Sequence, residues 1–113
     1  MSSITIGKHI TNSVNKTVLY TVPANKIAKW DLLYSANTLG NNKTISVWWY
    51  IASTNTEIAI INEYTLTSNF FLQWNGAGSY VQLSEFDEIR VLVEDSSDFS
   101  VIATLHLEKQ TQG

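Results

Sequence analysis

Apolar and polar residues alternate with a period of two along most of the chain, the pattern of half-buried β-strands. The most apolar strand is predicted at residues 44–52, where Val47 and Trp49 share one face while Trp48 and Tyr50 share the other, so that both faces are apolar. The segments with this pattern are 4–10, 18–22, 28–34, 44–52, 58–66, 70–74, 81–83, 89–93 and 99–107. Since no segment has the length and 3.6-residue period of a helix, we predict about eight or nine strands.

The strand at 28–34 carries its apolar residues in an irregular order. Strict alternation places Trp30, Leu32 and Tyr34 on one face with Ala28, and it leaves Leu33 as an apolar exception on the other. Turn residues separate this strand from its neighbours, including the only proline of the chain, Pro23.

The strongest turn signal lies at residues 75–79, which read Asn-Gly-Ala-Gly-Ser. An Asn-Gly pair favours a tight hairpin loop with positive φ angles. The pattern therefore predicts that the strand ending at Trp74 and the strand beginning near Val81 form a hairpin.

The spacing of the strands is close to the 8–12 residues typical of β-sandwiches and barrels. We predict an all-β fold with two packed antiparallel sheets, and both jelly-roll and immunoglobulin-like topologies fit the pattern. With 113 residues, the natural interpretation is one domain covering residues 1–113. Within it, residues 1–16 form either an N-terminal arm or an edge strand, and residues 109–113 form a frayed tail.

Composition narrows the function classes. Only 15% of residues are charged, the net charge is −3, and the basic residues are scattered, which argues against binding to nucleic acid. The chain has no cysteine, which excludes disulfides and thiolate catalysis. No apolar run reaches the ~20 residues that span a bilayer, and no signal peptide is visible, so we expect synthesis in a cytoplasm and no membrane partner.

No group of residues has the spacing of a catalytic or metal site. Pairing of the first and last strands could bring His9 near His106 and Glu108 as metal ligands, but two strand residues that face solvent are the simpler interpretation. The acidic residues from Glu85 to Asp98 could bind calcium, although they lack EF-hand spacing. We therefore predict no enzymatic activity, no catalytic residues, no cofactor and no metal.

Aromatic residues are the best candidates for a functional surface. A two-layer sandwich buries one face of each sheet, so apolar residues on both faces of one strand indicate a contact with a partner. The predicted protein-interface residues are Trp48, Tyr50, Phe71, Trp74 and Tyr80. A loop or the N-terminal segment folding over them is the plainer alternative. A third reading is a glycan-binding surface, in which Trp48, Tyr50, Trp74 or Tyr80 stacks on sugar rings.

Two segments resemble small virion proteins of tailed bacteriophages. They are Leu19-Tyr-Thr-Val-Pro-Ala-Asn-Lys and the later Leu83-Ser-Glu-Phe-Asp-Glu-Ile-Arg-Val. The resemblance extends from about Thr17 to Glu108, with Asn25 where a turn glycine often stands. It implies an oligomeric β-sandwich that decorates a capsid or builds a tail, neck or fibre part.

The resemblance and the residues together suggest a non-enzymatic virion protein that decorates or cements a capsid. Its expected partners are the major capsid protein or other virion subunits, with self-association as a trimer, and its expected location is the virion, assembled in the bacterial host cytoplasm. A carbohydrate-binding adhesion module is the alternative.

Overall fold

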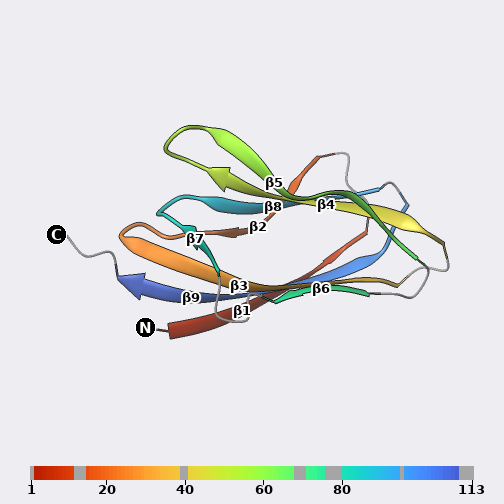
Figure 1. Ribbon diagram of the computed structural model, residues 1–113, viewed down its shortest axis with the longest axis horizontal. Coiled ribbons are helices and arrows are strands. Elements are labelled where there is room, and N and C mark those ends of the chain that lie inside the picture. The colour runs from red at the N-terminus through yellow and green to blue at the C-terminus, as the bar shows by residue number, and fades with distance from the viewer. Residues whose placement is uncertain are drawn as a thin grey trace.

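The computed structural model describes residues 2–11, 15–38, 41–67, 71–75, 80–94 and 96–109. It confirms the predicted all-β, two-sheet fold (Figure 1). The described strands are β1 (Ser2–Ile10), β2 (Thr17–Thr21), β3 (Lys26–Asn37), β4 (Lys43–Ile51), β5 (Thr56–Leu66), β6 (Phe71–Asn75), β7 (Val81–Leu83), β8 (Glu88–Val93) and β9 (Phe99–Lys109).

The strand order is that of a jelly roll. One sheet runs β1-β9-β3-β6, with the short β7 also paired to β3, and the other runs β2-β8-β4-β5. The pairs β1·β9, β2·β8, β3·β6 and β4·β5 are all antiparallel. They nest inside one another along the chain, as they would if one long hairpin were wrapped into two layers, and this nesting defines the jelly roll among the double-sheet folds.

The core lies between the two layers and follows the alternation in the regular strands. Val47 of β4, Val91 of β8 and Val101 of β9 are fully buried, as their spacing predicts. The largest fully buried side chains are Trp30 and Phe99, which lie in neighbouring strands of the first sheet. The inward faces of β4 and β8 in one sheet and of β9 in the other therefore account for much of the packing.

The predicted faces of β3 are wrong beyond Trp30. The register of β3 against β9 shifts between Trp30 and Leu32, which makes Asp31 a bulge residue. A bulge adds one residue and reverses the parity of the side chains that follow. Leu33 is therefore buried, while Leu32 and Tyr34 turn to the outer face. In the sequence, the change of face is marked only by the two consecutive apolar residues Leu32 and Leu33.

The hairpin predicted at the Asn75-Gly pair is also wrong. Residues 71–75 and 81–83 do not pair with each other, because both pair with β3: Asn75 lies opposite Leu32, and Val81 lies opposite Trp30. Thus β6 and β7 are two parts of one interrupted edge strand, and the interruption falls opposite the Asp31 bulge. Residues 76–79 themselves lie outside the described part of the chain.

A buried carboxylate links several loops at one end of the second sheet. Asp87 is 2% exposed and accepts hydrogen bonds from Trp49 Nε1 and from the backbone N–H groups of Ala52 and Ser84, each at 3.0 Å. Its own carbonyl oxygen accepts the Val22 N–H at 2.9 Å. Asp87 therefore holds together the β4–β5 turn, the β7–β8 loop and the exit from β2.

The two ends of the described chain lie side by side. All nine residues of β1 pair with β9, from Ser2 opposite Leu107 to Ile10 opposite Phe99, so this segment is an edge strand (Figure 1). Lys109 is the last residue of β9, and the rest of the expected frayed tail lies outside the described residues. The described segments contain no helix that is long and apolar enough to cross a membrane.

Candidate functional site

The predicted interface residues are divided between the two sheets. Trp48 and Tyr50 lie on the outer face of β4, opposite to the buried Val47. Phe71 and Tyr80 belong to the other sheet, where they are 48% and 47% exposed. Trp74 lies in β6 opposite Leu33, and its side chain is outside the described part of the structure. These residues therefore cannot form one continuous patch.

Cations cover the aromatic rings of β4. Lys16 Nζ lies 4.1 Å from the centroid of the Trp48 ring, and Arg90 Cζ lies 3.7 Å from the centroid of the Tyr50 ring. The Glu57 carboxylate connects the two cations, since it accepts from Lys16 Nζ and, at 2.8 Å, from Arg90 Nη1. Much of this face is therefore closed by the chain's own cation–π and ionic contacts.

The hydrogen bond from Lys16 and that from Arg90 lower the pKa of Glu57 below its usual value. A carboxylate whose pKa is depressed by folding contributes stability above its unfolded pKa, and that stability is lost as the pH falls through the folded pKa.

We therefore expect the free energy of unfolding of a Glu57→Gln variant to decrease less steeply than that of the parent as the pH falls below about 4.3. The difference near neutral pH should be at most about 1 kcal/mol, because the network is partly exposed. Urea unfolding at a series of pH values measures it. If the free energy of unfolding of the two proteins decreased with the same slope at acidic pH, that result would contradict the role assigned to Glu57.

The outer face of the first sheet carries an open apolar surface. The Tyr34 and Phe71 rings stack with their centroids 5.5 Å apart. Ile102 of β9 lies opposite Tyr34, and Leu32 precedes Tyr34 on the same face. We call this group, made of Leu32, Tyr34, Phe71 and Ile102, the aromatic face. It exists because the Asp31 bulge turns two apolar residues of β3 outward.

A polar cluster borders the aromatic face towards the chain ends. His106 Nδ1 lies 2.7 Å from Ser3 Oγ, and His106 Nε2 lies 2.8 Å from Asp31 Oδ2, so one imidazole joins β1, β9 and β3. Beside it, Lys29 Nζ lies 3.0 Å from Glu108 Oε1 and 5.1 Å from the Tyr80 ring centroid. These side-chain contacts link neighbouring strands across an exposed surface of the sheet.

The two histidines considered as metal ligands are not brought together. His106 lies opposite Ser3, whereas His9 lies opposite Ser100, further along the same strand pair. His9 contacts Asp98 instead. Among the described residues, no group of three or more His, Asp or Glu side chains is placed to hold a metal ion.

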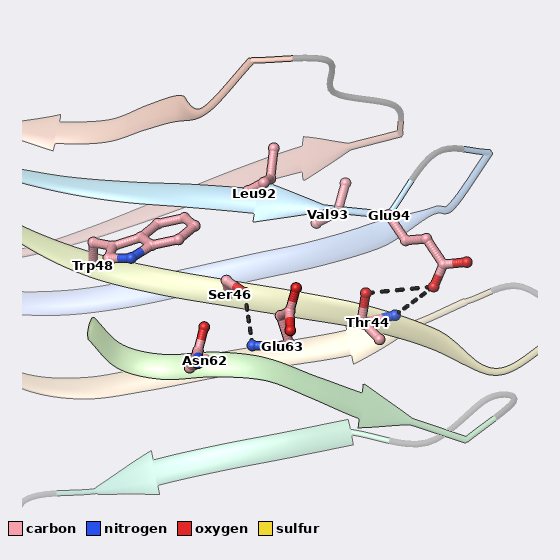
Figure 2. A pocket seen from close by; sticks show the side chains of 8 residues that line it. All are labelled: Thr44, Ser46, Trp48, Asn62, Glu63, Leu92, Val93 and Glu94. Atoms are coloured by element: carbon pink, nitrogen blue, oxygen red, sulfur yellow. Dashed lines mark hydrogen bonds between the residues drawn. The ribbon is translucent and has the colours of Figure 1, made fainter.

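A hollow of about 130 Å³ opens on the outer face of the second sheet (Figure 2). Its lining residues are Thr44, Ser46, Trp48, Asn62, Glu63, Leu92, Val93 and Glu94. Of these, sequence reasoning identified Trp48 as an interface candidate and Glu94 as one of the acidic residues considered for calcium. The polar residues of β5 were missed because a bulge, which strand alternation does not reveal, brings them together.

That bulge lies between Ile61 and Tyr64. On β4 only Ser46 separates their partners Val47 and Ile45, whereas on β5 Asn62 and Glu63 both fit into the same interval. Glu63 has a φ of 49°, and its N–H donates to Ser46 Oγ at 2.7 Å. Consecutive strand residues normally face opposite sides of a sheet, but here both side chains line the hollow (Figure 2).

Comparison with known proteins supports the fold and gives no family. No family model matches the chain, and no curated protein matches it. A solved structure described under Bacillus endospore appendages, a novel family of disulfide-linked pili, is 9% identical with a TM-score of 0.52, covering 97% of this chain and 88% of that one. A structure of infectious bursal disease virus Gt strain is 7% identical with a TM-score of 0.43, covering 99% of this chain and 38% of that one. At such identities, the appendage protein is similar to this chain in fold alone.

Proposed function

We propose that this chain is a non-enzymatic structural subunit of a virion, which decorates or cements a capsid by docking its aromatic face on a neighbouring subunit. The observation that carries the proposal is the stacked Tyr34–Phe71 pair, whose Phe71 ring is 48% exposed on a sheet face that normally meets water. Exposed aromatic side chains of this kind are typical interface anchors.

The contrast between the two outer faces supports this choice of surface. On the second sheet, Lys16 and Arg90 cover the rings of Trp48 and Tyr50. On the first sheet, Lys29 lies over the Tyr80 ring, whereas the stacked Tyr34–Phe71 pair lies beside uncharged side chains such as Gln73, which cost little to desolvate. The proposed docking surface is therefore Phe71 with its neighbours, and Trp48 and Tyr50 have a smaller part in it.

The partner would be the major capsid protein or another virion subunit, and copies of the chain would associate as a homo-oligomer, with a trimer as the specific proposal. The appendage protein that shares the fold is described as forming disulfide-linked pili. This chain has no cysteine, so links between its copies must be non-covalent or use other chemistry. A tail, neck or fibre position would use the same surface.

The mechanism would be mechanical. Burial of apolar surface contributes about 25 cal/mol per Å² before the entropic costs of association. One such contact is weak, but repeated contacts over a symmetric shell become strong through multivalency. The assembled location would be the virion, after synthesis in the host cytoplasm.

We expect a Phe71→Lys variant to weaken docking at least about tenfold, because it places a charge in the centre of the buried apolar surface. Sedimentation with purified particles and light scattering of the free protein measure docking and self-association. A Tyr64→Ser variant is the matched control, since Tyr64 is a 50% exposed aromatic residue on the other sheet. A wild-type protein that stays monomeric and never sediments with particles would contradict the proposal.

A further inference from the structure

We infer that the hollow on the outer face of the second sheet is a binding subsite for one neutral pyranose ring. This inference concerns a surface on the opposite side of the sandwich from the aromatic face, and it does not depend on the proposed structural role. It rests on the size of the hollow, on its lining and on the backbone that shapes it.

The size fits a single sugar ring. A volume of about 130 Å³ is comparable with the roughly 150 Å³ of a cavity that binds one six-membered benzene ring. That space matches one monosaccharide and is too small for an oligosaccharide to be enclosed. Longer glycans could still extend from it, because the hollow is open to solvent along the sheet.

The lining combines an apolar wall with hydroxyl-binding groups. Trp48 and Leu92 supply apolar surface, against which the C–H groups of a pyranose can pack (Figure 2). Lys16 covers one face of the indole, so contact is limited to the part of the ring that remains uncovered. Asn62 and Glu63 supply amide and carboxylate groups from the facing strand, which can bind adjacent sugar hydroxyls.

The remaining polar groups are oriented by the chain itself. Glu94 Oε1 accepts from the Thr44 backbone N–H at 3.0 Å, and Lys43 Nζ lies 3.8 Å from Glu94 Oε2, which offsets its charge. Ser46 Oγ accepts the Glu63 N–H, so its own hydroxyl proton is available to donate. With the Glu94 charge offset, the Glu63 carboxylate dominates the lining, which favours a neutral ligand over an anionic sugar.

The backbone at Glu63 gives independent support. A non-glycine residue with a φ of 49° is energetically unfavourable, and such conformations are concentrated at binding and catalytic sites. Bulges likewise occur where a side chain is redirected towards a ligand. Here the strained bulge has one clear effect, which is to place two consecutive polar side chains at the same hollow.

Saturation-transfer NMR tests the subsite with methyl α-glucopyranoside, methyl β-galactopyranoside and N-acetylglucosamine as neutral probes. We expect transfer to at least one of them at millimolar concentration, little change on adding salt, and none to glucuronate. Methylguanidinium serves as a cationic probe. Binding of methylguanidinium without any neutral sugar would overturn the inference and assign the hollow to a basic side chain instead.

The deciding variant is Glu63→Gly. Glycine adopts positive φ without strain, so this change removes the carboxylate while retaining the bulge. We expect sugar affinity to fall at least about tenfold with the fold intact by circular dichroism. Asn62→Ala is a second variant with the same expected direction, and Gln82→Ala on the other sheet is the control. Unchanged sugar binding in both hollow variants, or no binding of any neutral probe to the parent, would overturn the inference.

Discussion

An Asp87→Ala variant should lose about 3 kcal/mol of its free energy of unfolding, because each partly buried donor left without a partner costs about 1 kcal/mol. Three donors depend on this one carboxylate: the Trp49 indole N–H and the backbone N–H groups of Ala52 and Ser84. They belong to strand β4, to the β4–β5 turn and to the β7–β8 loop, so the loss should loosen a whole end of the second sheet. Urea unfolding followed by circular dichroism measures the change.

An Asp87→Asn variant tests whether the shape of the side chain or its two acceptor oxygens is responsible for this stability. Asparagine keeps the shape but offers one oxygen, and its amide N–H₂ faces a donor, so we expect about half of the alanine loss. Glu85→Ala is the neighbouring control, because Glu85 accepts a solvent-exposed hydrogen bond from the Asn25 N–H, and its loss should cost less than about 1 kcal/mol. Equal, small losses for all three variants would contradict the role of Asp87.

A Trp30→Ala variant should be destabilised to a similar extent, by about 3–5 kcal/mol. Trp30 is fully buried and is the largest side chain of the core, so its removal leaves a cavity that the surrounding strands cannot fill. Since domains of this size are stable by only about 5–15 kcal/mol, the variant should unfold at a much lower urea concentration. A fall of less than about 1 kcal/mol would show that the core is not packed around this ring.

Trp30 also holds the β3 bulge, and a milder variant tests that contact. Its Nε1 donates to the Leu32 carbonyl oxygen at 3.0 Å, across the bulge residue Asp31. Trp30→Phe keeps an aromatic ring and loses the donor, so beyond the smaller ring it should cost about 1 kcal/mol for the hydrogen bond. A Trp30→Phe variant as unstable as Trp30→Ala would assign the effect to the lost hydrogen bond, and a Trp30→Phe variant as stable as the parent would show that this hydrogen bond contributes nothing.

Sequence patterns predicted the parts of the fold that depend on local regularity. In β8 and β9 the alternation is unbroken, so the burial of Val91 and Val101 follows from spacing alone. The pattern failed at Asp31 because a bulge changes parity without changing composition. It failed again after Asn75, because β3 provides a better partner to both flanking strands than they provide to each other.

The functional surfaces were harder to predict because they depend on residues distant in the chain. The spacing indicated that Trp48 and Tyr50 share an outer face, but the cations that cover them come from Lys16 and Arg90. The aromatic face requires the β3 bulge, and the hollow requires a second bulge at Glu63. Pairings such as Ser3 with His106, which are 103 residues apart, have no local signal.

The pairing of the first and last strands determines how the domain would respond to force. Because Ser2 lies opposite Leu107, the two chain ends leave from the same end of the sandwich (Figure 1). Tension applied between these ends would act along the hydrogen bonds between β1 and β9, because antiparallel hydrogen bonds lie perpendicular to the strands. The hydrogen bonds would therefore break one after another, starting from the chain ends. Unzipping of this kind needs less force than shearing all rungs together. We therefore expect the domain to unfold at a lower force when it is pulled between its two termini than when the load is applied across the sides of the sandwich.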